Sequence, residues 1–244
     1  MGRTFENRKQ AILKRGARDA RAFTKAGRQI AIAVKSGGPD EDANPTLRRA
    51  IQNARAVNMP KDKIKYAIDK ASGANQGDDF GEVLYEGYGP HGVALLVDAL
   101  TDNPTRTVAN VRSHFKKGGG SLGNSGSVAF LFEQYGYFLI EPEAVDRDSL
   151  ELELIDHGLE ELNETTDDDG KPLLSAWCSR DSFGAMQLAL ESREVSVNSS
   201  GFLWSPSTQV AVSVEAAEEI TALIERLEDD DDVQKVFSNA EWPD

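Results

Sequence analysis

The sequence of residues 14–38, KRGARDARAFTKAGRQIAIAVKSGG, superimposes two helical patterns. Ala20, Phe23, Gly27, Ile30 and Val34 recur at steps of three, four and seven, which places them on one face of an α-helix. Basic residues recur at the same steps about half a turn away. The stretch therefore predicts a helix with an apolar seam behind a basic stripe, which consists of Lys14, Arg18, Arg21, Lys25, Arg28 and Lys35.

Two shorter amphipathic helices are predicted after this one. Asn44-Pro45 is typical of an N-cap followed by proline in the first helical turn, with Leu47 and Ile51 on the inner face. Pro60 opens the next helix, which we expect to end at Gly73. Residues 1–75 are accordingly predicted to form a basic helical domain.

The charge of the chain reverses after this domain. Residues 1–75 hold 17 Lys and Arg against 7 Asp and Glu, whereas residues 76–244 hold 10 against 34. The polar stretch at residues 75–79 lacks any periodicity and marks a domain boundary. Such asymmetry indicates a basic partner-binding end carried by an acidic body.

Strand patterns dominate the acidic body. A β-α-β unit is predicted from a strand at 92–99, a helix at 103–117 and a strand at 127–133, and a second from a strand at 209–214, a helix and a strand at 233–237. Between them, residues 136–205 predict a β-α-β-β-α-β unit, with a hairpin at 167–170 and a last strand at 194–197. The expected fold class is α+β, with a three-helix domain followed by two ferredoxin-like domains, one inserted in the other. The predicted domains are 1–75, 80–134 together with 206–244, and 135–205.

The composition indicates a cytoplasmic protein. The longest apolar runs are far shorter than the roughly 20 residues that a membrane span needs, so no membrane partner is expected. Cys178 is the only cysteine, which excludes an internal disulfide and fits a reducing compartment.

No catalytic, metal or cofactor signature is present. His91, His114 and His157 lack metal-ligand spacing, and the acid runs at 167–169 and 229–232 lack the ligand pattern of a calcium loop. The glycine-rich stretch at 118–126 follows a helix and precedes a strand, the reverse of a phosphate-binding loop, and is predicted to be a flexible connector. The alternative is a loop that approaches a backbone or a partner closely. We therefore expect a protein that is not an enzyme and has no cofactor.

The basic stripe points to a nucleic-acid partner. Lysine and arginine on one helix face can neutralise several phosphates and release their counterions. The alternative is an ordinary solvated helix face, but only Glu6 and Asp19 are acidic among the first 35 residues. The predicted phosphate contacts are Lys14, Arg18, Arg21, Lys25 and Arg28, flanked by Arg8, Lys9 and Arg15.

Several motifs resemble the YebC/PmpR family in the order in which that family has them. They are NP at 44–45, NMPKD at 58–62, YEGYGP at 85–90, TDN at 101–103, GGSLG at 119–123, GSV at 126–128, LED at 227–229 and VFSN at 236–239. The resemblance covers nearly the whole chain and implies a helical domain followed by two α+β domains. It departs at the N-terminus, where many members have Gly-His-Ser-Lys-Trp and this chain has Gly2-Arg3-Thr4-Phe5-Glu6. A contact made through that His or Trp is therefore not carried over.

The resemblance implies two alternative functions. Family members are commonly described as probable transcriptional regulators that bind promoter DNA. Others, including a mitochondrial one, resemble translation factors that act on ribosomes stalled at proline-rich stretches. The expected partner is accordingly duplex DNA, with ribosomal RNA on the ribosome as the alternative. No helix shows an identifiable set of base-reading Asn, Gln and Arg residues, so contact with phosphates is the part that the residues themselves support.

Overall fold

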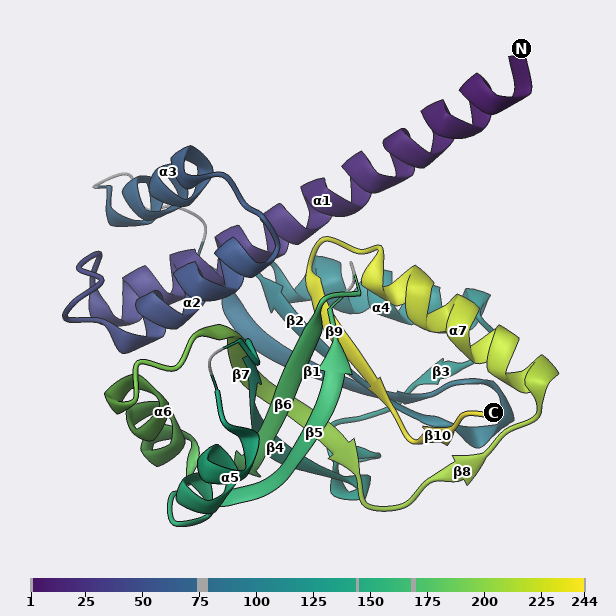
Figure 1. Ribbon diagram of the computed structural model, residues 1–244. Helices are drawn as coiled ribbons and strands as arrows, with labels where there is room; N and C mark the ends of the chain where they lie inside the picture. The colour runs from purple at the N-terminus through teal and green to yellow at the C-terminus, as the bar shows by residue number, and fades with distance from the viewer. Residues whose placement is uncertain (1, 74–78, 144, 168–169, 244) are drawn as a thin grey trace.

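A computed structural model describes residues 2–73, 79–143, 145–167 and 170–243, with side chains described from residue 18 onward (Figure 1). The helical domain consists of α1 (Gly2–Gly37), α2 (Pro45–Ala56) and α3 (Lys61–Ser72). The Asn44 Oδ1 accepts the backbone N–H of Leu47 at 3.0 Å, which confirms the predicted N-cap of α2. The third helix likewise begins after Pro60 and ends before Gly73, as predicted.

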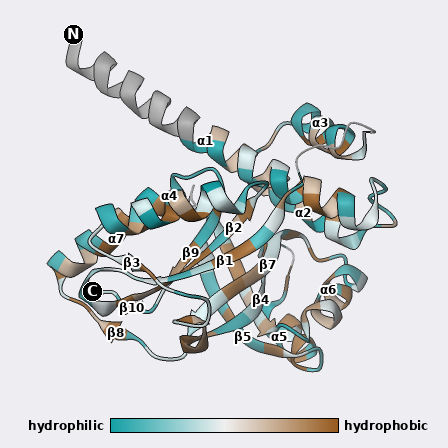
Figure 2. Ribbon diagram, turned by 180° about the vertical axis from the view of Figure 1, so that it is seen from behind, coloured by the Kyte–Doolittle hydropathy of each residue, from teal (hydrophilic) through white to brown (hydrophobic). Residues whose placement is uncertain are grey.

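The apolar seam of α1 packs against the two shorter helices. Ile30, Leu47 and Ile51 are at most 2% exposed and form the centre of this core. Within the described side chains of α1, the seam begins near Phe23, which is half-buried, and continues to Val34. Figure 2 shows the same arrangement, with α2 lying between α1 and the strands.

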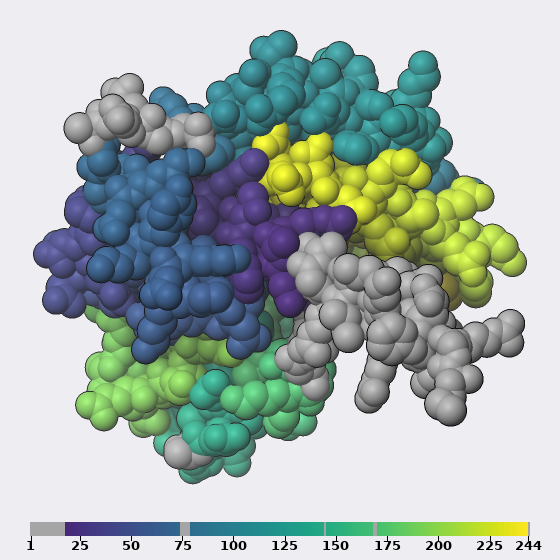
Figure 3. Space-filling model, turned by 90° about the horizontal axis from the view of Figure 1, so that it is seen from above, coloured from purple at the N-terminus to yellow at the C-terminus, as the bar shows by residue number. Residues whose placement is uncertain are grey.

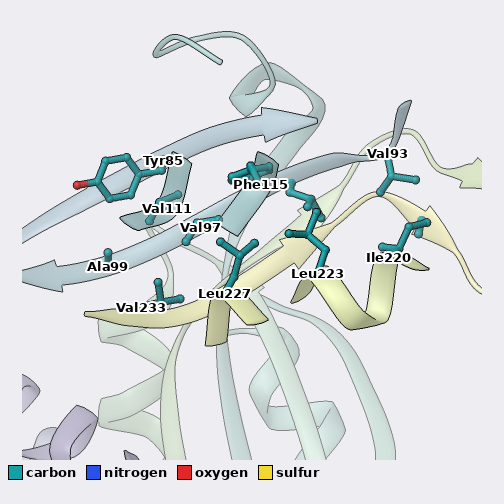
Figure 4. Packing of buried hydrophobic residues seen from close by; sticks show 12 residues of the cluster. Tyr85, Val93, Val97, Ala99, Val111, Phe115, Ile220, Leu223, Leu227 and Val233 are labelled. Atoms are coloured by element: carbon teal, nitrogen blue, oxygen red, sulfur yellow. The ribbon is translucent and has the colours of Figure 1, made fainter. Parts of the chain in front are cut away.

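The first sheet is antiparallel and has the strand order β3-β1-β2-β9. Its strands are β1 (Gly81–Tyr88), β2 (Ala94–Thr101), β3 (Ser121–Leu122) and β9 (Val233–Ser238). Helices α4 (Pro104–Lys117) and α7 (Val214–Glu228) cover one face. There Phe115, Leu223 and Leu227 are fully buried, and Figure 4 shows them packed against the sheet.

The second sheet is also antiparallel and has the order β5-β6-β4-β7. It is built from β4 (Phe132–Ile140), α5 (Arg147–Ile155), β5 (Leu159–Thr166), β6 (Pro172–Ser179), α6 (Phe183–Ser192) and β7 (Val197–Pro206). This order and connectivity are those of a ferredoxin-like unit. The short strands β8 (Val210–Ala211) and β10 (Ala240–Glu241) pair with each other in parallel.

The α+β class, with a helical region in front of strand-rich parts, is confirmed. The first sheet nevertheless differs from the expected pair of β-α-β units. Strand β1 was not predicted, because its acidic and glycine residues, Glu82, Glu86, Gly81 and Gly87, hide the apolar pattern. Its pairing with β2 gives a strand order that is not ferredoxin-like.

Three of the expected strands also differ from those observed. Most of the strand expected at 127–133 is replaced by a 3₁₀ turn, η2 (Ala129–Leu131), before β4 begins. The strand expected at 209–214 is reduced to β8, and the one expected at 194–197 begins only at Val197. The predicted boundary between residues 134 and 135 falls inside β4, while the domain limits themselves remain a prediction.

The helical domain is fixed to the second sheet through α2 and the edge strand β7. The Asn53 side chain donates to the Ser200 carbonyl at 2.8 Å and accepts the Ser200 N–H at 3.0 Å, as a neighbouring strand would. Arg49 lies over the rings of Phe183 and Phe202, at 5.2 and 5.6 Å from their centroids. These contacts hold α2 in place, so its inner face is occupied.

Candidate nucleic-acid interface

The predicted phosphate contacts, which are residues of the basic stripe together with the flanking Arg8, Lys9 and Arg15, divide into a described and an undescribed part. Arg8, Lys9, Lys14 and Arg15 lie outside the residues whose side chains the structure describes. Arg18 is exposed, whereas Arg21, Lys25 and Arg28 are half-buried. The inner three face the first sheet, and Figure 3 shows the surface of α1 in contact with that of the C-terminal segment.

The inner bases contact the connection between α7 and β9, residues 228–232, which we call the acidic turn. Arg21 forms an ion pair with Asp229. The Lys25 Nζ donates to the carbonyl oxygens of Glu228, at 3.1 Å, and Gln234, at 3.4 Å. Burial lowers the pKa of Lys25 against the opposing attraction of Glu228. The lysine is therefore held as a hydrogen-bond donor in a partly desolvated position.

Arg28 makes the largest number of these contacts. Its guanidinium pairs with Asp232 at 2.8 Å, donates to the carbonyl oxygens of Leu100, at 3.0 Å, and Asp231, and lies 5.1 Å from the centre of the Phe80 ring. It thus joins α1 to β2 and to the acidic turn.

Asp232 is the buried centre of the turn, being 3% exposed. Its carboxylate accepts from the Thr107 hydroxyl at 2.6 Å and from Arg106 at 3.0 Å, in addition to Arg28. Burial opposes ionisation, but these donors outweigh it and hold the pKa of Asp232 below its ordinary value. The carboxylate therefore stays charged and anchors α1 and α4 together.

An open groove of about 1010 Å³ lies beside these contacts, between α1, α4 and α7. One wall is a ridge of α4 made by Arg106, Asn110, Ser113 and Lys117, and Arg28 of α1 also borders the groove. The opposite wall, from α7 and the acidic turn, carries both Arg226 and several acids. The groove is consequently polar and mixed in charge, with α1 and α4 opening onto the same space.

The charge distribution of α4 is a feature that the sequence interpretation missed. Residues 103–132 contain none of the 34 acids of the acidic body but four of its ten lysines and arginines. A count over short windows, in place of one total for the acidic body, would have found this segment.

The glycine-rich stretch after α4 is not the flexible connector that the sequence suggested. The buried Glu86 carboxylate accepts the backbone N–H groups of Gly126, Val128 and Ala129 at 2.6–2.8 Å. A Cβ on Gly120 would lie 2.5 Å from the Tyr88 carbonyl oxygen, so only glycine fits there. The stretch is therefore held in one conformation, because its glycines allow close packing and Glu86 binds its far end.

Candidate reactive groups are few in the described parts of the chain. Within them, no group of three or more His, Cys, Asp or Glu side chains is arranged to hold a metal ion. Cys178 is buried, which raises the pKa of its thiol to about 11 and leaves it protonated. His91 and His114 each lie beside one carboxylate, Glu219 and Asp230 respectively. In the same described residues, none of the helices is both long and apolar enough to cross a bilayer.

The arrangement defines a class of protein: a basic helical domain fixed to two antiparallel α+β units, with its cations facing an acidic turn. Family models match along nearly all of the chain. Residues 3–74 match the TACO1/YebC N-terminal domain, and residues 80–240 match the TACO1/YebC second and third domains. The chain belongs to the TACO1/YebC family, which confirms the resemblance read from its motifs.

Similar proteins extend over the full length. A probable transcriptional regulatory protein of Anaeromyxobacter dehalogenans is 52% identical over 98% of this chain and 99% of its own. One of Myxococcus xanthus with the same description is 49% identical, with the same shares covered. The crystal structure of a conserved hypothetical protein from Aquifex aeolicus is 37% identical and superimposes with a TM-score of 0.79, covering 92% of this chain and 91% of the other. Two of these full-length relatives are thus named probable transcriptional regulatory proteins.

Proposed function

We propose that this chain is a nucleic-acid-binding regulator of gene expression that contacts the phosphate backbone through the basic stripe of α1. The proposed contacts are Arg8, Lys9, Lys14, Arg15, Arg18, Arg21, Lys25 and Arg28. A backbone contact of this kind gives affinity without reading the base sequence.

The proposal rests on one observation: Arg21, Lys25 and Arg28 bind a series of oxygen atoms along the acidic turn. Arg21 and Arg28 are seven residues apart, about 10 Å along a helix, and bind the Asp229 and Asp232 carboxylates, with Lys25 between them on carbonyl oxygens. A run of acids along a chain resembles a run of phosphates in charge and in hydrogen-bond acceptors. In the complex, phosphate oxygens replace those of the acidic turn at Arg21 and Lys25. The buried pair of Arg28 with Asp232 is the last to open.

Duplex DNA is the first candidate target, because the relatives above are named probable transcriptional regulatory proteins. The acidic body then repels DNA and confines contact to the basic face. In this form the protein is a cytoplasmic DNA-binding regulator that performs no catalysis and has no cofactor or membrane partner.

Ribosomal RNA is the second candidate, and one observation favours it. The inner face of α2 is occupied by β7, and the exposed face of α3 presents lysines and Tyr66 but no Asn, Gln or Arg. Neither helix offers a base-reading set for the major groove. Recognition by shape and phosphate, as on folded RNA, needs no such set. In this form the protein is a translation factor for ribosomes stalled at proline-rich stretches.

Sedimentation of a cell lysate through a sucrose gradient separates the two targets. The lysate is run with and without a nuclease that removes DNA and spares ribosomes. A transcriptional regulator is expected near the top of the gradient, and it retains selected promoter fragments in a pull-down. Co-migration with ribosomal subunits after nuclease treatment supports the ribosomal alternative. Binding to neither, in purified form as well as in lysate, contradicts the proposed function.

A further inference from the structure

We propose a second phosphate-binding surface, separate from α1, formed by the C-terminal half of α4 and the glycine-rich stretch that follows it. We call it the α4 surface and define it by Arg112, Lys116, Lys117 and residues 118–126. Its ligand is the phosphodiester backbone of a nucleic acid that also contacts α1, so the inference rests on the proposed function.

The α4 surface lies in a segment of the chain that contains no acids. The thirty residues from 103 to 132 carry no Asp or Glu in a body that is otherwise strongly acidic. Cations stabilise α4 itself only in its last turn, where they interact favourably with the helix dipole. Arg112 lies before the last turn, five residues from the helix end at Lys117, and the acid-free stretch continues for fifteen residues beyond the helix. Helix stability therefore accounts for only part of the pattern.

The basic side chains of the α4 surface are available to bind phosphates. Arg112, Lys116 and Lys117 are all exposed, and within the described residues none of them has an ion-pair partner. Arg106, on the same helix, differs because it pairs with Asp102 and Asp232. The basic residue in the first turn of α4 thus stabilises the fold, while Arg112, Lys116 and Lys117, nearer the C-terminal end of the helix, are exposed and, in the described part of the chain, unpaired.

The glycine-rich stretch that follows α4 is held in place by hydrogen bonds. Glu86 holds its far end through three backbone N–H groups, and Gly119 and Gly126 have positive φ angles of 76° and 83°. Ser121, Asn124 and Ser125 are exposed on it and carry the neutral hydrogen-bonding groups that proteins use toward phosphates. Because the stretch is already ordered, binding a backbone there loses little conformational entropy.

The position of α4 joins this surface to the first. Lys117 borders the same groove as Arg28 of α1, so both basic helices open onto one side of the molecule. A nucleic-acid strand of sufficient length can contact α1 and the α4 surface at once. The acids that line the groove disfavour entry of the nucleic acid into it. The nucleic acid therefore contacts the basic residues of α1 and of the α4 surface on either side of the groove.

The test compares two triple variants of the full-length chain with the same charge change. One is Arg112→Gln, Lys116→Gln, Lys117→Gln; the control is Arg147→Gln, Lys171→Gln, Arg193→Gln on the second sheet unit. Affinity is measured by fluorescence anisotropy against salt concentration with three labelled probes: a DNA duplex, an RNA duplex and a single-stranded RNA. Circular dichroism and thermal unfolding verify that both variants are folded.

We expect the α4 triple variant to lower the slope of log affinity against log salt by about 2.7, since each of the three lost phosphate contacts on duplex DNA is worth about 0.9. The control is expected to change the slope by less than about 0.5. Equal effects of the two variants overturn the inference, and the proposed function stands if bases of α1 still matter. Failure of the unmodified protein to bind any of the three probes overturns the inference, and failure to bind ribosomes as well overturns the proposed function. The probe with the largest difference identifies the form of nucleic acid that the surface contacts.

Discussion

The buried side chain of Glu86 fixes the end of the glycine-rich stretch. Burial opposes its ionisation, but backbone N–H groups of the glycine-rich stretch outweigh burial and hold the pKa of Glu86 below its ordinary value. A group with a lowered native pKa contributes stability above its unfolded pKa and loses it as the pH falls through the native pKa. The anchor is therefore complete at neutral pH and weakens in acid.

Replacing Glu86 by Gln tests this anchor. We expect the free energy of unfolding to fall by about 1–3 kcal/mol at neutral pH, because hydrogen bonds to a charged acceptor are lost in a buried position. The difference from the unmodified protein is expected to shrink below about pH 4. Urea unfolding across this pH range measures it, with the exposed Glu218→Gln as the control. A constant difference at all pH values would show that the charge of Glu86 is not the cause.

Asp98 gives the opposite pH dependence. Burial, reinforced by repulsion from Glu82, raises its pKa to about 6, while Lys235 acts against the shift. The native state then binds a proton more tightly than the unfolded chain, so stability falls as the pH rises from about 4 to about 6.

We therefore expect Asp98→Asn to stabilise the protein at neutral pH by about 1–3 kcal/mol, and to have little effect below about pH 4. Thermal unfolding followed over this range measures the effect, with the exposed Asp69→Asn for comparison. A loss of stability at neutral pH would mean that attraction to Lys235 outweighs the cost of burying the charge.

At the scale of elements, the docking of α2 on β7 decides whether the helical domain has a fixed position. Asn53 completes the hydrogen bonding of Ser200, which is buried at the edge of the second sheet. Removing the amide leaves both backbone groups of Ser200 without these partners.

Asn53→Ala is expected to cost about 1–3 kcal/mol and to speed the hydrogen exchange of β7 around Ser200. Exchange measured by mass spectrometry locates the effect. Arg55→Ala, on the same helix but in an exposed pair with Glu41 at 3.9 Å, is expected to change stability by less than about 0.5 kcal/mol. Unchanged exchange at β7 in the Asn53 variant would rule out the proposed docking role.

The elements also show what the sequence can and cannot predict. The helices were predicted well because their caps are local: the Asn44 cap and Gly73 act within one turn. Strand β1 was missed because the burial of Glu86 depends on N–H groups forty residues away, which no local pattern reveals. Likewise, the two-residue β8 carries an apolar pattern but pairs outside the main sheets.

At the scale of the whole molecule, the sequence predicts the positive charge of the basic domain but not the groups that its basic residues contact. Arg21, Lys25 and Arg28 were predicted as phosphate contacts from their spacing and from the scarcity of acids around them, whereas the structure has them on the acidic turn, about 200 residues later in the chain. Proximity of such distant segments follows only from the fold. Their phosphate contact remains a proposal that requires exchange of the acidic turn for nucleic acid.

The central claim is that the basic stripe of α1 and its flanking bases bind nucleic-acid phosphates. The residues before Arg18 test it while Arg21, Lys25 and Arg28, which contact the acidic turn, are kept. The variant is Arg8→Gln, Lys9→Gln, Lys14→Gln, Arg15→Gln in the full-length chain. The matched control removes four bases from the exposed surface of α2 and α3, as Arg55→Gln, Lys61→Gln, Lys65→Gln, Lys70→Gln.

The decisive measurement is the salt dependence of binding to a labelled DNA duplex and to purified ribosomes. The account predicts that, on the duplex, the α1 variant lowers the slope of log affinity against log salt by about 3–4, whereas the control lowers it by less than about 1. On ribosomes the same ranking of the two variants is expected. An α1 variant that binds both targets like the unmodified protein, or no worse than the control, would contradict the account.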